Sequence, residues 1–304
     1  MPPADPPAPD DVPPALRQGH PLQGLGYRAP VLRRPYTRLN GADRAAYEGA
    51  VAEEVPVALV YNARPYAVMM ATPADLEDFA VGFTLSETIV RAADEVTRVQ
   101  VIPHAQGVDV QIAIPDAAAE HLGERGRAMI GRAGCGLCGV ETIQGVLREP
   151  RTIPKGTGIA VEALWRAERE LPARQVWNHE TGALHAAAWA TDEGVPEIVR
   201  EDVGRHNALD KVIGALARAG RSPTEGFVLV TSRASYELVQ KAAAVGVRLL
   251  AAVSRPTGLA IGLAEASGMT LVALLRGSTA DVYAHGERLL GYSGGERDQP
   301  EPAR

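Results

Sequence analysis

Cysteine is scarce in this chain: its 304 residues contain two, Cys135 and Cys138, which form a single C-x-x-C pair. A small secreted fold stapled by disulfides needs several cysteines spread along the sequence, so this scarcity excludes that class. A lone C-x-x-C pair instead indicates redox, metal-binding or sulfur-handling chemistry. The pair is therefore the feature of the sequence that says most about function.

Long apolar runs and an excess of positive charge are also missing. No stretch approaches the roughly 18 to 20 consecutive apolar residues of a membrane-spanning helix, and no cationic segment followed by an apolar run opens the chain. The net charge of −6 argues against a general nucleic-acid binder, because such proteins gain affinity by neutralising phosphates. We therefore expect a cytoplasmic protein with neither a membrane nor a nucleic acid as its partner.

Proline and polar residues dominate both ends of the chain. Ten of the 23 prolines fall within the first 35 residues, so little there can be buried and we expect residues 1–34 to be disordered. The polar tail at 293–304 is expected to be disordered for the same reason. Between these ends we expect a small α+β domain at 35–125, a cysteine-bearing loop and linker at 126–158, and a larger α/β domain at 159–292.

Alternating apolar residues define the elements of the small domain. Residues 55–61 and 66–71 flank an Asn-Ala-Arg-Pro turn and predict a hairpin. A helix is expected next, with Thr72 as its cap and Pro73 in its first position, because apolar residues then recur at i, i+3, i+4 and i+7. Residues 108–114 alternate with period two, as a half-buried strand does.

Strand and helix patterns alternate through the larger domain. Strands are expected at 198–200, 227–231, 247–253 and 269–275, and helices at 207–219, 235–245 and 259–266. Gly220, Gly246 and Gly268 stand where helix C-caps belong. This order, with its short connections, predicts the α/β class with a mainly parallel sheet and helices packed on it.

An arginine follows each of these strands, and hydroxyl side chains follow most of them. Parallel α/β sheets bind ligands outside the carboxyl ends of their strands, and all four turns would share that edge. Helix N-terminal amides and four converging guanidinium groups suit a phosphate or pyrophosphate, so we predict an anion site there. We call this set the strand-end rim: Asp202, Arg205, His206, Ser232, Arg233, Ser235, Ser254, Arg255, Thr257, Arg276, Ser278 and Thr279.

Zinc chemistry fits the cysteine pair poorly. A structural zinc site would need two more ligands, and the candidates His179 and His185 begin 41 residues beyond Cys138, far outside compact finger spacing. A zinc deaminase carries H-x-E upstream of P-C-x-x-C, whereas the H-x-E at His285 lies downstream and Gly134 replaces the proline. We therefore predict no metal site.

Glycine surrounds the two cysteines, which favours a sulfur carrier. A thioredoxin-like pair opens a helix after a strand, but four glycines within residues 131–139 predict a mobile loop. On such a loop a thiolate can accept sulfur as a persulfide and carry it to a bound acceptor, with Arg125, Arg127 and Arg132 nearby to favour the thiolate. Thiol–disulfide exchange stays open as an alternative.

Four blocks of sequence lie at residues 68–83, 131–141, 201–211 and 237–242, and the second block reads Gly-Arg-Ala-Gly-Cys-Gly-Leu-Cys-Gly-Val-Glu. In this order they resemble the FdhD family of formate dehydrogenase accessory sulfurtransferases. The resemblance extends over nearly everything from about residue 35 to residue 290. Blocks of this length are far more specific than a lone C-x-x-C pair.

The resemblance implies a cytidine-deaminase-like α/β domain beside a small α+β domain, in a homodimer. It also implies a sulfurtransferase that takes sulfur from a cysteine desulfurase as a persulfide on Cys135 and delivers it to a molybdenum bis(molybdopterin guanine dinucleotide) cofactor. Cys138 would hold or release the sulfur. The catalytic subunit of formate dehydrogenase, which needs the sulfurated cofactor, is then a partner. A chaperone that escorts the cofactor without thiol chemistry is the alternative.

By the same resemblance, the cofactor binds at the strand-end rim and GDP mimics part of it. The residues that the resemblance implies are Leu274, Leu275, Arg276, Gly277, Ser278 and Thr279. The strand-end argument adds Arg205, His206 and Arg233 as cofactor-binding residues. The chain departs from the family pattern nearby. The family often reads Ser-Gly-Arg where this chain has Ser232 before Arg233, Thr279 stands where a second arginine is common, and Asp281 replaces an asparagine. Asp281 adds negative charge beside the expected anion site.

Overall fold

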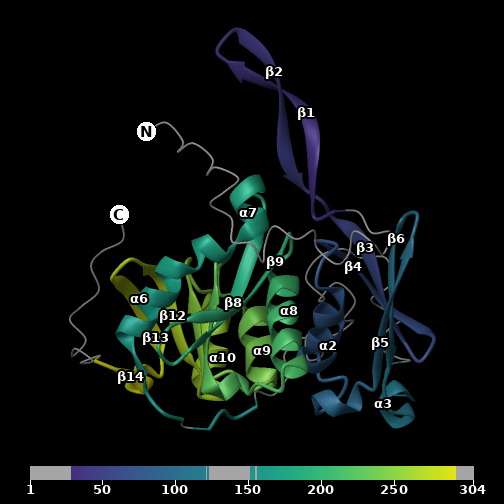
Figure 1. Ribbon diagram of the computed structural model, residues 1–304. Coiled ribbons are helices and arrows are strands. Elements are labelled where there is room, and N and C mark those ends of the chain that lie inside the picture. The colour runs from purple at the N-terminus through teal and green to yellow at the C-terminus, as the bar shows by residue number, and fades with distance from the viewer. Residues whose placement is uncertain (1–28, 121, 123–150, 155, 292–304) are drawn as a thin grey trace.

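Two β-sheets with helices packed against them organise the computed structural model, which describes residues 29–120, 122, 151–154 and 156–291 (Figure 1). A four-stranded sheet is built from residues 55–113 and a six-stranded sheet from residues 185–284. The chain is therefore a mixed α/β protein, which is the class that the sequence predicts.

The smaller sheet begins with the predicted hairpin of β3 (Val55–Tyr61) and β4 (Arg64–Ala71). The two turn residues between them have φ angles of 46° and 63°, the left-handed geometry that matches the twist of hairpin strands. β6 (Gly107–Ala113) pairs in parallel with β3, and β5 (Arg98–His104) pairs antiparallel with β6. The order β4-β3-β6-β5 confirms the hairpin and the strand expected at 108–114.

Helix α2 (Leu76–Ser86) covers one face of this sheet, and its predicted apolar face is buried there. Thr72 does not cap the helix, because its hydroxyl oxygen accepts a hydrogen bond from the N–H of Val203 at 3.1 Å. The helix instead begins after Asp75, whose backbone is left-handed with φ of 53°. The predicted cap is therefore wrong, since Thr72 binds a loop of the larger sheet rather than its own helix.

Four strands of the larger sheet point in the same direction: β9 (Pro196–Asp202), β10 (Gly226–Val230), β11 (Leu249–Ala252) and β12 (Thr270–Arg276). β8 (His185–Thr191) lies between β9 and β10 and runs antiparallel to both. β13 (Thr279–Ala284) forms one edge, antiparallel to β12. The order β13-β12-β11-β10-β8-β9 is therefore mixed, and it includes two strands that the strand–helix alternation does not predict.

Strand β8 escapes prediction because its sequence, His-Ala-Ala-Ala-Trp-Ala-Thr, is rich in alanine, a residue depleted in strands. Its five central residues are nonetheless buried, and the last four of them, residues 187–190, alternate between two cores. One core lies beneath α8 (Arg205–Arg218) and the other beneath α6 (Val161–Glu170). Helices therefore cover both faces of the strand, and small side chains let them approach closely.

Helices α8, α9 (Tyr236–Ala244) and α10 (Gly258–Ser267) each follow a strand, as predicted. The glycines that the sequence places after these helices have φ angles of 64°, 84° and 77°. This left-handed conformation is the one that ends a helix, and glycine adopts it without steric cost. The predicted helix ends are therefore confirmed.

Shorter elements complete the described chain. α3 (Asp116–Glu120) follows the smaller sheet, α7 (Val176–Thr181) precedes β8, and β7 (Ile159–Ala160) pairs in parallel with β14 (Leu289–Leu290). Single 3-10 turns lie at Ala93–Glu95, Pro172–Arg174, Pro223–Glu225 and Gly286–Arg288.

β1 (Val31–Asn40) and β2 (Asp43–Ala52) form a two-stranded antiparallel ribbon that projects away from both sheets (Figure 1). At its base, Nη2 of Arg33 lies 3.6 Å from Oε2 of Glu180 in α7. Residues 31–34 fall within the expected disordered arm, yet they are strand, because each pairs with a residue of β2. Residues 31–52 are called the ribbon below.

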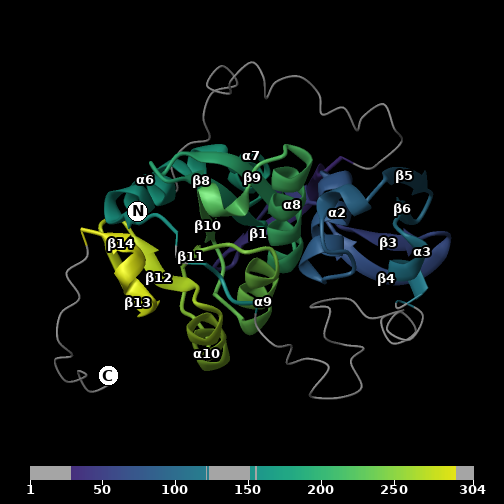
Figure 2. The ribbon, with the colours of Figure 1, turned by 90° about the horizontal axis from the view of Figure 1, so that it is seen from below.

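Helices α2 and α8 join the two halves of the molecule and lie side by side in both views (Figure 2). They cross at Gly82 and Gly214, where the two backbones touch. A β-carbon on Gly82 would lie 1.7 Å from the carbonyl oxygen of Asp210, and one on Gly214 would lie 1.8 Å from that of Asp78. The glycine pair therefore fixes how closely the smaller sheet and its helix approach the larger sheet.

We predict that Gly82→Ala lowers the free energy of unfolding by roughly 3 kcal/mol or more, because the added methyl group meets backbone atoms that cannot rotate away. Urea unfolding followed by circular dichroism measures this loss. Gly262→Ala on α10 is the matched control, since nothing lies within 4 Å of its added β-carbon. We expect that control to change stability by between zero and a gain of about 1 kcal/mol. Equal stabilities for the two variants would contradict the crossing.

Candidate functional site at the strand ends

The strand-end rim lies at the carboxyl ends of the strands that share a direction in the larger sheet. β9, β10, β11 and β12 end there because they share a direction, and β8 begins there because His185 pairs with Asp202. Neighbouring strands are about 4.8 Å apart, so the four steps from β12 to β9 span about 19 Å. The turns that carry the arginines are therefore spread along an edge instead of meeting at one point.

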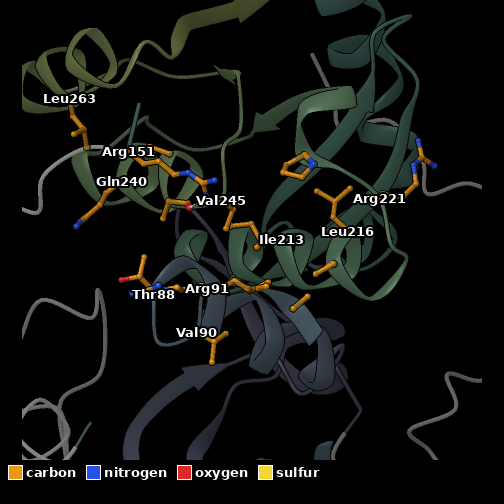
Figure 3. Close-up of a pocket in the computed structure, with 17 residues that line it drawn as sticks. Thr88, Val90, Arg91, Arg151, Ile213, Leu216, Arg221, Gln240, Val245 and Leu263 are labelled. Atoms are coloured by element: carbon orange, nitrogen blue, oxygen red, sulfur yellow. Dashed lines mark hydrogen bonds between the residues drawn. The ribbon is translucent and has the colours of Figure 1, made fainter. Parts of the chain in front are cut away.

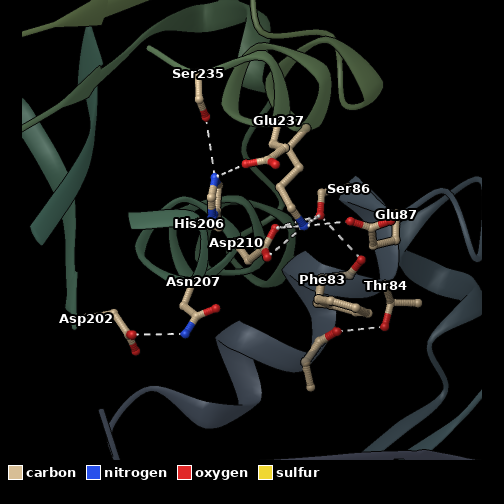
Figure 4. Close-up of polar contacts among 12 residues, drawn as sticks. Phe83, Thr84, Ser86, Glu87, Asp202, His206, Asn207, Asp210, Ser235 and Glu237 are labelled. Carbon is tan, nitrogen blue, oxygen red and sulfur yellow. Dashed lines mark hydrogen bonds and ion pairs between the residues drawn. The ribbon is translucent and has the colours of Figure 1, made fainter. Parts of the chain in front are cut away.

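Arg205 and His206 open α8 at the β9 end of the rim. His206 is buried, and its Nε2 lies 2.6 Å from Oε2 of Glu237 and 3.4 Å from Oγ of Ser235 (Figure 4). The imidazole therefore ties α8 to the start of α9 and does not face solvent. Nε of Arg205 is buried and has no hydrogen-bond partner in the described part of the chain. An orphaned cationic donor of this kind fits an anionic ligand.

His185 lies beside this pair at the first position of β8. Burial lowers the pKa of His185, and the nearby positive charge of Arg205 lowers it further. The imidazole is therefore neutral near pH 7, because its ordinary pKa is already about 6.5. A bound anion would stabilise the protonated ring and raise this pKa, so His185 can report on occupancy of the rim.

The three other rim arginines, Arg233, Arg255 and Arg276, are exposed at or just beyond the ends of β10, β11 and β12. Two rim hydroxyls have structural roles instead. Oγ1 of Thr257 accepts a hydrogen bond from a backbone N–H of α10 and caps that helix. Ser232 is buried, and its Oγ donates to the carbonyl oxygen of Arg233 at 3.1 Å. Arginine side chains are thus the main groups that the rim offers to an anion.

Residues 274–279 comprise the end of β12, the two-residue turn after it and the first residue of β13. Leu275 is buried in the core of the larger sheet, so its side chain is not accessible to a ligand. Residues 276–279 are exposed at the tip and include the part of this segment that a ligand can contact. The N–H of Gly277 donates to Oε2 of Glu168 at 3.3 Å, a bond that an anion would have to displace.

Asp202, another rim residue, points inward and forms a buried ion pair. Its Oδ2 lies 2.6 Å from Nζ of Lys211, and both side chains are 0% exposed. Lys211 also donates to the carbonyl oxygen of Thr72 at 3.1 Å, and the N–H of Thr72 donates to Asp202 Oδ2 at 3.0 Å. The pair therefore fastens the connection between β4 and α2 to the larger sheet, and Asp202 is not available to a ligand.

A second buried cluster joins α2, α8 and α9 (Figure 4). Nζ of Lys241 lies 2.9 Å from Oδ2 of Asp210, 2.9 Å from Oε1 of Glu87 and 3.0 Å from Oγ of Ser86. Burial on its own would lower the pKa of Lys241, but the two carboxylates outweigh it and raise that pKa. Burial raises the pKa of Asp210. The ammonium group is therefore charged and holds the two halves of the molecule together.

These two clusters account for three of the four sequence blocks that carry the family resemblance. Residues 68–83 supply α2 and the connection to it, residues 201–211 supply both aspartates and Lys211, and residues 237–242 supply Lys241. Sequence reasoning missed this structural role. The signal that could have found it is Asp210 next to Lys211 inside a helix whose neighbouring residues are apolar, because charged groups on a core-facing helix need partners.

A pocket of about 600 Å³ lies between the loop after α2 and the C-terminal ends of α8 and α9 (Figure 3). Its lining is largely apolar and includes Ile213, Leu216 and Val245, together with Arg91 and Arg151. The rim lies at the N-terminal ends of the same two helices. Of the predicted site residues that the structure describes, none lines this pocket, so it is distinct from the strand-end rim.

Cys135 and Cys138 lie outside the described residues, as do Arg125, Arg127 and Arg132. Among the residues that the structure does describe, no group of three or more His, Cys, Asp and Glu side chains could hold a metal ion. No helix of the described part has the length and apolarity that a membrane span requires. The strand-end rim is therefore the predicted site whose geometry the structure provides.

We predict that GDP binding raises the pKa of His185, because the negative charge of the diphosphate stabilises the protonated ring. NMR titration of the histidine ring signals, with and without the nucleotide, measures this shift. His104 on β5 is the control, since it belongs to the other sheet and its signals should not respond to GDP. A His185 titration that saturating nucleotide leaves unchanged would put the nucleotide away from the rim.

We predict that Lys241→Met lowers the free energy of unfolding by about 3 to 5 kcal/mol at neutral pH, because the buried carboxylate of Asp210 and the partly buried carboxylate of Glu87 lose their cation. The loss should grow with pH. Burial already holds the folded pKa of Asp210 above its unfolded value, and removing the nearby ammonium charge should raise it further, so the variant loses more stability than the wild type as pH rises.

Urea unfolding at about pH 5 and about pH 8 tests this dependence, and equal losses at both would contradict it. Glu197→Gln is the control because it breaks an exposed pair with Arg221, whose Nη1 lies 3.0 Å from the carboxylate. That control should change stability by no more than about 0.5 kcal/mol.

Comparison with known proteins agrees with the sequence blocks. The sequence model of the FdhD/NarQ family matches residues 52–290 of this chain. The chain is 51% identical over 264 residues to the sulfur carrier protein FdhD of Xanthomonas euvesicatoria pv. vesicatoria (strain 85-10), covering 86% of this chain and 94% of that protein. It is 50% identical over 245 residues to the sulfur carrier protein FdhD of Bordetella petrii, covering 81% and 88%.

The fold is also similar to a solved structure. A crystal structure from Desulfotalea psychrophila, described as that of a candidate formate dehydrogenase accessory protein, matches with a TM-score of 0.67 and 23% sequence identity. The match covers 86% of this chain and 99% of that chain, and at this identity it concerns the fold alone. Because the family match and the relatives at about half identity both cover most of the sequence, the chain belongs to the FdhD/NarQ family.

Proposed function

We propose that this chain is a sulfurtransferase that takes sulfur from a cysteine desulfurase as a persulfide on Cys135. It delivers that sulfur to the molybdenum bis(molybdopterin guanine dinucleotide) cofactor destined for the catalytic subunit of formate dehydrogenase. The observation that carries the proposal is the position of the chain's two thiols, which stand together inside the region that matches the family. The relatives that match this region are named sulfur carrier proteins.

Sulfur uptake needs a thiolate at Cys135. The thiolate attacks the terminal sulfur of the donor's persulfide, a new S–S bond forms, and the donor's cysteine leaves as a thiolate. The sulfane sulfur changes hands without net oxidation or reduction. Arg125, Arg127 and Arg132 precede the cysteine in the sequence, and their positive charge favours the thiolate.

Release uses the second thiol. Attack of the Cys138 thiolate on Sγ of Cys135 forms a disulfide between the two residues and frees hydrosulfide, which carries the electron pair of the broken bond. A cellular dithiol then reduces the disulfide. The molybdenum cofactor is the substrate of this transfer and accepts the sulfur as a ligand.

The strand-end rim suits the phosphates of that substrate. It offers three exposed arginines along an edge of about 19 Å, and it adds the Nε of Arg205 at the N-terminus of α8, which has no hydrogen-bond partner among the described residues. A pyrophosphate can accept several charge-assisted hydrogen bonds from such donors. GDP is therefore the mimic that we propose for binding studies. Asp281 lies near the β12–β13 tip, so the contacts there fall to Arg276 and to backbone N–H groups.

The segment between the cysteines and Arg151 is long enough for a thiol to reach the strand-end rim. Cys138 precedes Arg151 by 13 residues, a separation that spans at most about 45 Å when fully extended. Arg151 lines the pocket at the far ends of α8 and α9. The 14 residues of α8 separate that pocket from the rim by about 21 Å. A thiol tethered there can therefore reach a substrate on the rim.

The proposal extends to architecture, assembly and location. We take the larger sheet and its helices to be a cytidine-deaminase-like domain, and the protein to act as a homodimer. A persulfide carrier needs its thiols reduced between cycles, and the cytoplasm keeps thiols in that state. We therefore place its work in the cytoplasm.

Intact mass spectrometry tests the carrier function. After incubation with a cysteine desulfurase and cysteine, the wild-type chain should gain one sulfur atom, which a thiol reductant removes. Cys135→Ala should abolish the gain, whereas Cys138→Ala should retain it, because that thiol is used in release. A wild-type mass that stays unchanged while the desulfurase turns over would rule the carrier out.

The rim by itself would support a second function, a chaperone that binds and escorts the cofactor. This function needs Arg205 and its neighbours but neither thiol. Full activation of formate dehydrogenase by the Cys135→Ala/Cys138→Ala variant, in cells that lack the wild-type chain, would favour the chaperone. A reversible Cys135–Cys138 disulfide that forms without any persulfide would instead indicate a thiol–disulfide oxidoreductase.

A further inference from the structure

The pocket between the loop after α2 and the C-terminal ends of α8 and α9 has the size of a ligand site (Figure 3). Its volume of about 600 Å³ lies inside the range of about 300 to 1,000 Å³ that small-molecule sites occupy. Apolar side chains line most of it, including Ile213 and Leu216 of α8, Val245 at the end of α9 and Leu263 of α10. The size and the lining therefore suit a small molecule with an apolar body.

Both halves of the molecule contribute walls to this pocket. The end of α2 and the loop after it supply Leu85, Thr88 and Val90, whereas α8, α9 and α10 supply the facing wall. The crossing at Gly82 and Gly214 fixes the distance between α2 and α8, so the two walls cannot slide together and close the space. The pocket is therefore preformed, and a ligand can enter it without the cost of rearranging the helices.

The charged groups of the lining all have the same sign. The described residues that line the pocket include the three arginines Arg91, Arg151 and Arg221 and no aspartate or glutamate. This local excess of positive charge occurs in a chain whose net charge is −6. The carboxylate of Glu87, next to the lining, is turned toward Lys241, and its Oε1 lies 2.9 Å from Nζ. The pocket therefore favours an anion.

Two of the three arginines have donors available for a ligand. The guanidinium group of Arg91 has no ion-pair or hydrogen-bond partner among the described residues. Arg151 donates from Nη1 to the carbonyl oxygen of Ala244 at 3.2 Å, which uses one of its five N–H groups. Arg221 is already engaged, because its guanidinium group pairs with a glutamate and lies over a tryptophan ring. Arg91 and Arg151 are therefore the groups that can bind an anion here.

The backbone of the pocket wall is strained at one position. Thr88 is exposed and has a φ angle of 54°, in the left-handed region. A β-branched residue adopts this conformation only at a steric cost, and it keeps it only where the surrounding structure holds it in place. Residues of this kind cluster at ligand clamps. The strain at Thr88 is therefore a second observation that indicates a ligand site.

We propose that this pocket binds a small organic acid, a monocarboxylate with an apolar body. Its carboxylate pairs with Arg91 and Arg151, because planar guanidinium groups match the geometry of a carboxylate. Its apolar body lies against Ile213 and Val245, which stand between the two arginines in the view of Figure 3.

A single negative charge suits this pocket better than the charges of a phosphate or pyrophosphate. Removing a charge from water is costly unless it is paired, and the apolar lining offers few donors besides the two arginines. The strand-end rim, at the other ends of α8 and α9, is the more polar of the two sites. The organic acid is therefore a ligand distinct from the substrate proposed for the rim, and the inference does not require sulfur transfer.

Calorimetric titration of the full chain with octanoate tests the inference. The wild type should bind octanoate, and Arg91→Gln/Arg151→Gln should weaken this binding by about 10-fold or more, because charge-assisted hydrogen bonds are lost. The neutral analogue 1-octanol should bind the wild type and this variant equally. Arg64→Gln is the matched control, since it removes an exposed arginine at the start of β4, and it should bind octanoate like the wild type.

Methyl NMR of the wild type locates the ligand without any substitution. Octanoate should shift the methyl signals of Ile213, Val245 and Leu263. The signals of Leu39 should not move, because this leucine is exposed on the ribbon and would report non-specific adhesion of an apolar acid. A wild type that does not bind octanoate, binding that survives the loss of both arginines, or shifts that spare the pocket methyls would each overturn the proposal. Persulfide formation on Cys135 is measured separately, so neither result decides the other.

Discussion

The close crossing of α2 and α8 is the contact on which the rest of the structure depends. Gly82 and Gly214 bring the two backbones together, and the Lys241 and Lys211 clusters surround the crossing with buried charges. A buried ion pair adds little net stability when intact but is costly to break. The crossing therefore tolerates little sliding, and it fixes the position of the rim at one end of α8 and of the pocket at the other.

The elements that local patterns decide could be predicted from the sequence. The hairpin of β3 and β4 and the glycines after the three long helices need only short-range information. Strand β8 could not be predicted, because helices on both of its faces select alanine against its intrinsic preference. The ribbon was not predicted, because a proline, Pro35, among polar residues is not typical of a strand. Proline is nonetheless tolerated in a strand that has no neighbour on one side, as in this ribbon.

The location of the rim follows from topology, but the role of each side chain on it does not. Spacing puts Asp202, His206 and Arg205 in one turn, yet Asp202 and His206 point into the protein while Arg205 keeps a donor free of described partners. Only packing decides such directions. Three of the blocks that resemble the family help to hold the halves of the molecule together, whereas the cysteine block is the one for which we propose a chemical role.

Transfer of labelled sulfur tests the central claim most directly. A chain loaded with radiolabelled persulfide is mixed with formate dehydrogenase that carries unsulfurated cofactor, and the label on the released cofactor is followed over time. The account predicts that label moves from the wild-type chain to the cofactor and that none moves from Cys135→Ala. A cofactor that acquires sulfur equally well in the presence of a chain without its cysteines would contradict it.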